Sequence, residues 1–265
     1  MSLDKYSEAA KILFEHKLNK TGLESLDTEY KPLNLDEAYK IQDELKILYL
    51  KLHNNDVLGK KIGVTNKEAA KQVGINQPFY GNLFTRFSEI NKKSLKSKNF
   101  HKPYLEPEIG FRIKDDINIT LAPFNLEDIE TLIDGMLCAV EIVDFRFLKP
   151  INKIGAFNLI ATNGASDYWV RNENLYSLNK IDLNNHEIKI FVDSNICEVG
   201  NTNNVLKNPL NAVIWLINTL ALKGEPMLKG QFISTGSCTK AILLKKNYKV
   251  KADFGSLGCI EFEYK

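Results

Sequence analysis

The residues most able to do chemistry in this chain are three glutamates in two apolar, strand-like segments. Glu106 and Glu108 lie in the segment Leu105–Phe111, and Glu141 lies in the segment Val140–Asp144. Because side chains at positions i and i+2 of a strand point to the same face, Glu106 and Glu108 are predicted to project together. Neighbouring carboxylates repel each other unless positive charge lies between them, and a lone charge in an apolar strand is costly to bury.

Three convergent carboxylates, with no histidine or cysteine in either segment, form a donor set for a hard divalent cation. Oxygen donors of this kind favour Mg²⁺ or Mn²⁺ over Zn²⁺. Pro107 points to a special site, since a proline inside a strand belongs at a sheet edge or a bulge, and Gly110 is expected to leave room above the carboxylate face. The alternative is a solvated face of a half-buried sheet, and other segments of the chain favour the metal site.

Short motifs accompany these glutamates in a defined order along the chain. They are Gly59–Thr65, Gly74–Gly81, Glu106–Glu108, Glu141–Asp144, Asn208–Val213 and Thr235–Ser237. Their order and spacing are specific together, and the series resembles the fumarylacetoacetate hydrolase superfamily over nearly the whole chain. Within it, the chain is most similar to the branch of 2-hydroxypenta-2,4-dienoate (2-keto-4-pentenoate) hydratases and 4-oxalocrotonate (2-oxo-3-hexenedioate) decarboxylases.

This resemblance implies a β-roll with its site inside, a homo-oligomer, and a role in the catabolism of aromatic compounds. It also implies that Glu106, Glu108 and Glu141 are the metal ligands. Mg²⁺ held by carboxylates usually keeps several waters, so a small 2-oxo acid substrate could displace two of them with its carboxylate and keto oxygens. The ion would then stabilise charge on the keto oxygen as the substrate becomes an enolate, which leads to hydration or decarboxylation.

Lys61 matches the lysine of the family's Gly-Trp-Lys-Val-Gly motif, which implies a catalytic role beside the metal. Its charge could hold the substrate carboxylate or help to move a proton, and the alternative is a solvated surface lysine. Lys60 replaces the tryptophan of the motif and is expected to be exposed on the opposite face of the strand. Asn163, Ser166 and Ser237 are candidate substrate-binding residues, with simple turn residues as the alternative.

The chain departs from the family pattern at two acids of one motif and at a third acid later in the chain. The branch usually reads Asp-Gln-Pro-Asp-Tyr-Gly where this chain has Asn76 and Phe79 in place of the aspartates, and Thr162 replaces a third. A proton-shuttling acid would therefore be missing. One hypothesis is a divalent-metal-dependent lyase acting on a short 2-oxo or 2-hydroxydienoate acid, hydratase-like or decarboxylase-like. The other is a catalytically impaired relative that binds an oxo acid or pairs with an active paralogue.

Composition excludes several other classes. The chain has 265 residues and a net charge of +2, which gives no global case for nucleic acid as a partner. Four cysteines without a Cys-x-x-Cys pair indicate reduced thiols. The apolar stretch from Ala212 to Leu222 is shorter than a membrane span, so no membrane partner and a cytoplasmic location are expected. Ser237 lacks the glycine pattern of a nucleophile elbow.

The elements predict an α+β fold, with a helical N-terminal part packed on a mixed β-roll. Asn34 and Glu37 have the spacing of a helix start, followed by an apolar stripe up to Leu52. Further helices are predicted from Asn125 towards Ala139 and over Pro209–Leu222, and strands are predicted over Glu187–Asp193, Gln231–Ser234, Lys249–Phe254 and Cys259–Tyr264. We expect a helical region at 1–80 and a β-rich catalytic body at 81–265, together forming one continuous unit.

Overall fold

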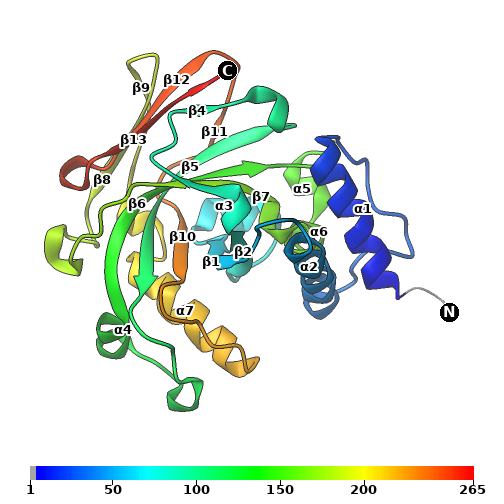
Figure 1. Cartoon of the computed structure of the whole chain (residues 1–265), viewed down its shortest axis with the longest axis horizontal. Helices are drawn as coiled ribbons and strands as arrows, with labels where there is room; N and C mark the ends of the chain where they lie inside the picture. Colours follow the sequence, from blue (N-terminus) through cyan, green and yellow to red (C-terminus); the bar gives the residue numbers. More distant parts are fainter. Residues whose placement is uncertain (1–3) are drawn as a thin grey trace.

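A large curled sheet forms the body of the computed structural model, which describes residues 4–265 (Figure 1). This eight-stranded sheet has the order β2-β1-β10-β5-β6-β7-β3, with β11 paired to β5. Its strands are β1 (Val57–Gly63), β2 (Phe79–Phe84), β3 (Ser88–Ile90), β5 (Pro103–Ile113), β6 (Ile133–Asp144), β7 (Ser166–Arg171), β10 (Phe232–Ser237) and β11 (Ile242–Leu243). The long antiparallel pair β5–β6 lies near the middle, so both of its strands are flanked by others.

A smaller, five-stranded sheet has the order β4-β13-β12-β8-β9. Its strands are β4 (Ser94–Leu95), β8 (Glu187–Val192), β9 (Asn195–Asn201), β12 (Tyr248–Asp253) and β13 (Cys259–Tyr264). Alternate residues such as Ile188, Ile190, Val250 and Ala252 are buried, as a half-buried antiparallel sheet requires. The strands predicted in this part of the sequence are confirmed, and Figure 1 shows this sheet at the end of the molecule opposite the first helices.

Helices cover the large sheet. They are α1 (Lys5–Asn19), α2 (Leu35–Leu50), α3 (Lys67–Val73), α4 (Leu126–Leu132), α5 (Ile151–Ile154), α6 (Ala156–Ala161) and α7 (Pro209–Leu222). Short 3₁₀ turns are η1 (Thr85–Phe87), η2 (Ser97–Asn99), η3 (Ile119–Leu121), η4 (Asn163–Ala165), η5 (Leu178–Lys180), η6 (Thr202–Asn204) and η7 (Gly255–Leu257). The mixture of helices and strands confirms the predicted α+β class.

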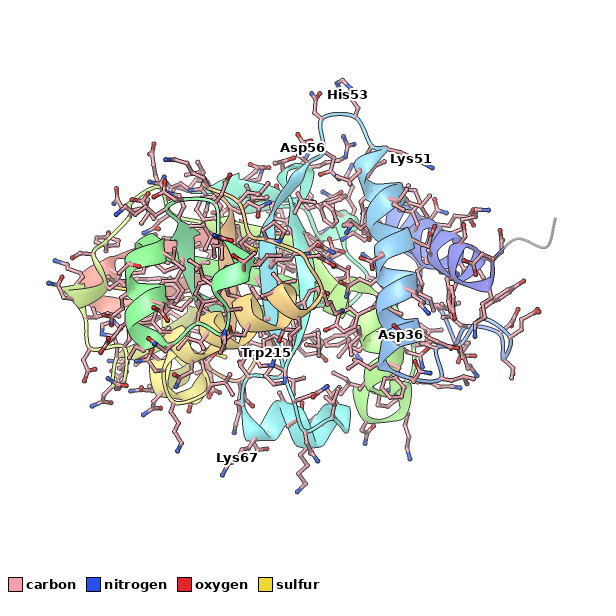
Figure 2. All side chains as sticks on the ribbon, turned by 90° about the horizontal axis from the view of Figure 1, so that it is seen from below. Asp36, Lys51, His53, Asp56, Lys67 and Trp215 are labelled. Atoms are coloured by element: carbon pink, nitrogen blue, oxygen red, sulfur yellow. The ribbon has the colours of Figure 1, made fainter. Side chains whose placement is uncertain are left out.

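The predicted helix after Asn34 is confirmed as α2. The Asn34 side chain accepts a hydrogen bond from the Glu37 backbone N–H at 2.9 Å, which caps the helix. In Figure 2 the helix runs from Asp36 to Lys51, and its apolar stripe faces the molecule. Gln42 donates to the backbone carbonyls of Tyr80 and Ile160, at 3.0 and 2.8 Å. This buried amide ties α2 to β2 and α6.

The predicted helix over Pro209–Leu222 is also confirmed, as α7, which lies beside β10 in Figure 1. The stretch Thr202–Leu222 is long and apolar enough to cross a membrane by length and composition. A core helix passes the same test, and Leu210, Val213 and Leu216 of α7 are buried in the main hydrophobic core. The apolar character of this segment is thus explained by packing inside the fold.

The helix predicted from Asn125 towards Ala139 is wrong in its second half. Asn125 and Asp128 do form the predicted capping box, but α4 ends at Leu132 and β6 begins at Ile133. From Ile133 onwards the backbone pairs with β5, beginning with Ile133 opposite Ile113. A β-branched, apolar run that finds a long partner strand is stabilised as a strand by cross-strand packing.

Of the two surroundings expected for Pro107, a sheet edge or a bulge, the structure shows a bulge, which lies in the neighbouring strand β10. The β10–β5 register shifts between Ser234, which lies opposite Gly110, and Ser237, which lies opposite Glu108. Gly236, in this bulge, has a φ of 100°, a conformation that glycine adopts without a Cβ clash. The expected room above Gly110 is not there, because Leu137 and Trp169 fill it.

The expected boundary at residue 80 falls inside β2 (Phe79–Phe84). Both β1 and β2 pair within the large sheet, with Lys61 opposite Gly81 in their antiparallel register. The N-terminal helical part that precedes the sheet therefore consists of α1 and α2, and the chain enters the sheet at Val57. This entry matters because β1 carries Lys61 towards the glutamates.

Candidate metal and lysine site

The three glutamates predicted as metal ligands meet on one face of the β5–β6 pair. Glu106 lies directly opposite Glu141 in the antiparallel register, and Glu108 lies two residues further along β5 on the same face. One carboxylate oxygen from each lies within 4.8 Å of the others. Glu108 and Glu141 are fully buried, and Glu106 is partly buried. The opposite face of β5, with Leu105, Ile109 and Phe111, belongs to the hydrophobic core.

The electrostatics of the three carboxylates are unfavourable as they stand. Burial, and then the charge of Glu141, raise the pKa of Glu106 to about 7. Burial and the charges of Glu141 and Glu106 likewise raise the pKa of Glu108 well above its usual range. Both shifts mean that negative charge is disfavoured here unless a positive charge joins the group.

The donor atoms of the site fit a divalent cation. Oε1 of Glu108 and Oε1 of Glu141 are buried without a partner, and Oε2 of Glu141 makes no hydrogen bond, although it lies 3.2 Å from Lys61 Nζ. Buried polar atoms are nearly always satisfied, so a cluster of unsatisfied carboxylate oxygens calls for an explanation. A hard cation that takes oxygen ligands supplies the missing partner for all of these atoms at once.

Lys61 extends from β1 into this group of carboxylates and is itself buried. Its Nζ lies 3.2 Å from Oε2 of Glu141 and donates a 3.4 Å hydrogen bond to the backbone carbonyl of Gly164. Burial alone would lower the pKa of Lys61, but the charges of Glu141, Glu106 and Glu108 outweigh burial and raise it. The lysine is therefore held as a cation beside the carboxylates.

Lys60 does face away from the glutamates, but the expectation that it is exposed is wrong. It is buried, and its Nζ donates to Oδ1 of Asn82 at 2.9 Å and lies 3.5 Å from Oε2 of Glu225. The ammonium also lies 5.1 Å from the ring centre of Tyr80. Polar and aromatic side chains from β2 and the segment after α7 cover this face of β1, so the lysine is satisfied without water.

Of the two residues that replace the family's acids, only Phe79 lies in the site. Phe79 is buried, its ring centre lies 5.6 Å from Lys61 Nζ, and it packs over Gly63 and Gly164. Asn76 is exposed. The substitution with a direct effect on the surroundings of Lys61 is thus the aromatic one.

The three predicted substrate-binding residues make backbone contacts or lie elsewhere. The Asn163 amide accepts from the backbone N–H of Asn82 at 2.6 Å and donates to its carbonyl at 2.9 Å. Ser237 donates to the carbonyl of Thr239 at 2.9 Å. Ser166 lines two small cavities beside Lys17 and Asp167, and none of the three glutamates lines them. Asn163 still shapes the site, because it precedes the carbonyl that receives Lys61.

Two residues beside the carboxylates were missed by sequence reasoning. Ser234 on β10 donates a short hydrogen bond to Oε2 of Glu108, and the indole N–H of Trp169 on β7 donates to Ser234 at 2.8 Å. Both side chains are buried. A tryptophan in a buried strand needs an acceptor for its N–H, and this requirement is the signal in the sequence that could have pointed to Trp169.

Comparison with known proteins agrees with this geometry. No family model matches the chain. A 2-keto-4-pentenoate hydratase of Paraburkholderia xenovorans (strain LB400) is 26% identical over 264 residues, which cover 100% of this chain and 96% of that relative. A 4-oxalocrotonate decarboxylase of Pseudomonas putida is 25% identical over 266 residues, 97% of each chain. These homologues are lyases.

Solved structures share the fold. The 4-oxalocrotonate decarboxylase from Pseudomonas putida G7, complexed with magnesium and adipate, superposes with a TM-score of 0.91 at 24% identity, over 100% of this chain and 99% of that one. A fumarylacetoacetate hydrolase family protein from Yersinia pestis CO92 gives 0.58 at 13% identity, over 81% and 96%. The chain is thus a homologue of the 2-keto-4-pentenoate hydratases and 4-oxalocrotonate decarboxylases, and it shares its fold with a fumarylacetoacetate hydrolase family protein.

Proposed function

We propose that this protein is a divalent-metal-dependent lyase that acts on a short 2-oxo or 2-hydroxydienoate acid. The reaction we favour is hydration of 2-hydroxypenta-2,4-dienoate. The observation that carries the proposal is the group of three carboxylates, Glu106, Glu108 and Glu141, with a charged Lys61 beside it. Glu108 and Glu141 are buried with oxygens that make no hydrogen bond. The names of the homologues point to the same chemistry.

The proposed ligands would hold the ion through oxygen atoms only, which favours Mg²⁺ or Mn²⁺. Solved relatives of the fold contain magnesium, calcium or manganese. When bound, such an ion stabilises negative charge on the keto oxygen of a 2-oxo acid as an enolate develops. A divalent ion also balances the charge that three glutamates leave uncompensated by one lysine.

Lys61 would bind the carboxylate of the substrate. Its ammonium remains charged in this environment and its position is fixed by the carbonyl of Gly164 and by Glu141. Phe79 and Trp169 place aromatic surface around the lysine and the carboxylates. A water-poor surrounding of this kind strengthens the attraction between an ammonium and a carboxylate.

Hydratase activity is favoured over decarboxylase activity by the number of cations near the site. In the described part of the chain, Lys61 is the one basic residue whose charge lowers the pKa of Glu106 and Glu108. One lysine and one metal ion supply enough positive charge to bind a substrate that has a single carboxylate. The apolar side chains around Lys61 and the carboxylate face, among them Phe79, Leu137 and Trp169, offer no charge to the second carboxylate of 4-oxalocrotonate. Decarboxylation remains the alternative, supported by the close structural similarity to a decarboxylase.

A third possibility is an impaired relative that binds a small oxo acid without turning it over, and Phe79 at the position of a family acid is what favours it. Turnover separates the three. The ultraviolet absorbance of 2-hydroxypenta-2,4-dienoate, and of 2-oxo-3-hexenedioate, would be followed with Mg²⁺, with Mn²⁺ and with a chelator. We expect metal-dependent loss of the first substrate. Turnover of the second substrate alone would support the decarboxylase, and turnover of neither would overturn the lyase proposal.

A further inference from the structure

A hydrogen-bond chain that crosses three strands ends on one of the proposed metal ligands. The indole N–H of Trp169 on β7 donates to Oγ of Ser234 on β10 at 2.8 Å, and Ser234 donates to Oε2 of Glu108 on β5. All three side chains are buried. Each of the two hydrogen bonds therefore joins side chains that are shielded from bulk solvent.

The direction of the chain follows from the chemistry of its members. The indole N–H is a donor only, whereas a serine hydroxyl has one proton and can also accept. Because Trp169 occupies an acceptor position on Oγ, the single proton of Ser234 is free to point to Glu108. Oε2 of Glu108 is thereby occupied, and Oε1 is left without a partner.

The surroundings of Trp169 hold this direction in place. Its strand position lies directly opposite Glu141, another proposed ligand. The indole also packs against Phe232, with ring centres 5.5 Å apart, and over Gly110. Ser234 lies between Lys61 on β1 and Gly110 on β5 in the sheet register. Neither side chain can rotate without disturbing the packing of the carboxylate face.

We propose that Trp169 and Ser234 are positioning residues that fix Glu108 as a one-oxygen ligand of the divalent ion. The chain keeps Oε2 occupied and turns Oε1 towards Glu106 and Glu141. This inference rests on the proposed metal site and assigns these two residues to it. Partners that orient a metal ligand typically contribute 10- to 100-fold to metal affinity, and we expect a loss of roughly that size when the chain is cut.

Metal titration of the whole protein tests the proposal. Mg²⁺ affinity would be measured by calorimetry for wild type, Trp169→Phe, Ser234→Ala and Ser234→Thr, with thermal unfolding to verify that each variant is folded. Trp169→Phe keeps an aromatic ring and removes the N–H. We expect this variant and Ser234→Ala to bind Mg²⁺ roughly 10- to 100-fold more weakly, and Ser234→Thr, which keeps the hydroxyl, to bind close to wild type.

The second tryptophan, Trp215, allows a matched control variant and a measurement by tryptophan fluorescence. Trp215 lies on α7 and is partly buried (Figure 2). Trp215→Phe should leave Mg²⁺ affinity unchanged. Since the sequence has two tryptophans, this variant also leaves Trp169 as the single indole. Its emission should change when paramagnetic Mn²⁺ binds, while Trp169→Phe should lose that response.

The outcomes separate this inference from the proposed function. If wild type binds no divalent ion, the metal site itself is wrong and the inference with it. If wild type binds Mg²⁺ and both Trp169→Phe and Ser234→Ala bind it equally well, the site stands and the positioning role is overturned. If Ser234→Ala alone weakens binding, the indole has no part in orienting Glu108, and the two-residue chain is overturned as proposed. Should Ser234→Ala fail to fold, Trp169→Phe decides.

Discussion

Two buried groups of charges in this molecule differ in one decisive respect. In the site, Lys61 faces the carboxylates of Glu106, Glu108 and Glu141, and several carboxylate oxygens make no hydrogen bond. In a second group, which we call the anchor cluster, Lys17 of α1 and Arg146 face Asp144 and Asp167 of the sheet. Asp167 Oδ2 lies 2.5 Å from both Lys17 Nζ and Arg146 Nη2, and Asp144 Oδ2 lies 2.8 Å from Arg146 Nη2.

The anchor cluster is balanced and its carboxylates are saturated. Asp144 also accepts hydrogen bonds from the backbone N–H groups of His101 and Lys102, at 2.8 and 2.6 Å. Although burial alone would raise the pKa of Asp167, Lys17 and Arg146 hold it below its usual range. Such a group holds α1 on the sheet and has no vacant ligand position to offer.

The pKa values of the two buried lysines differ in the same way. Burial, and to a smaller extent the like charge of Arg146, lower the pKa of Lys17 to about 8 in spite of Asp167. The pKa of Lys61 is raised, because three carboxylates outweigh its burial. Burial of charge is therefore no guide to function by itself. The site is distinguished by an excess of negative charge whose unpartnered atoms are carboxylate oxygens, whereas the unpartnered buried atoms of the anchor cluster are Nε and Nη1 of Arg146, which cannot bind a cation.

The largest expected effect is the loss of metal binding when a carboxylate of the site becomes an amide. Glu108→Gln and Glu141→Gln each remove one negative charge and one anionic ligand, so Mg²⁺ binding should fall below detection in calorimetry. The free energy of unfolding of the metal-free protein should not decrease, because the remaining glutamates repel each other less. Unchanged Mg²⁺ affinity in the Gln variants of Glu106, Glu108 and Glu141 would show that the carboxylates bind no ion.

The opposite result is expected in the anchor cluster. Asp167→Asn leaves Lys17 and Arg146 buried with one carboxylate between them, and removing one partner of a buried pair typically costs about 3–5 kcal/mol of stability. Urea denaturation measures the loss, with Glu106→Gln as the matched control from the site. A similar destabilisation by both changes would erase the distinction drawn between the two clusters.

A third prediction uses the two faces of β1. Lys61→Met should reduce turnover by about 10²–10⁴-fold, the usual contribution of a group that assists proton transfer or charge stabilisation. Lys60→Met should change kcat little, because its ammonium contacts Asn82 and Glu225 away from the carboxylates. Steady-state kinetics at saturating Mg²⁺ decides, and equal losses in the two variants would mean that Lys61 has no special role.

The smallest and most specific effect concerns Phe79. Replacing Phe79 by Asp restores an acid beside Lys61, and we expect 2-hydroxypentadienoate hydration to rise from a slow wild-type rate. Asn76→Asp adds the same charge at an exposed position and should have little effect. Comparison of kcat for these variants is the measurement. A wild-type kcat in the ordinary range of about 1–10³ s⁻¹, with no gain in Phe79→Asp, would mean that the missing acid is dispensable.

Site residues that lie close together in the sequence could be predicted from it, whereas contacts between distant segments could not. The alternation of side chains along a strand was enough to put Glu106 and Glu108 on one face, and the family's motifs pointed to Glu141 and Lys61. The contacts of Ser234 and Trp169 could not be read in the same way. They require β10 and β7 to flank the β5–β6 pair, and sheet order is a tertiary property.

The mistaken predictions have the same origin. Lys60 was expected to be exposed because only its own strand was considered, whereas Tyr80 and Glu225 from other segments cover it. The helix expected up to Ala139 was contradicted because β5 offers residues from Ile133 onwards a partner strand. The amide of Asn163 makes hydrogen bonds to the backbone of Asn82, which the sequence did not indicate, and its contact with substrate stays a prediction.

The glycines along Lys61 have a thermodynamic consequence. A Cβ at Gly81 would lie 3.2 Å from Lys61 Cδ, and a Cβ at Gly164 would lie 3.3 Å from its Nζ, so the extended lysine fits between two positions that lack side chains. A lysine side chain carries about 2 kcal/mol of rotamer entropy. Here that entropy is lost when the chain folds, not when a substrate arrives. The ammonium is therefore already ordered for an incoming anion, and side chains at these two glycines would remove that advantage.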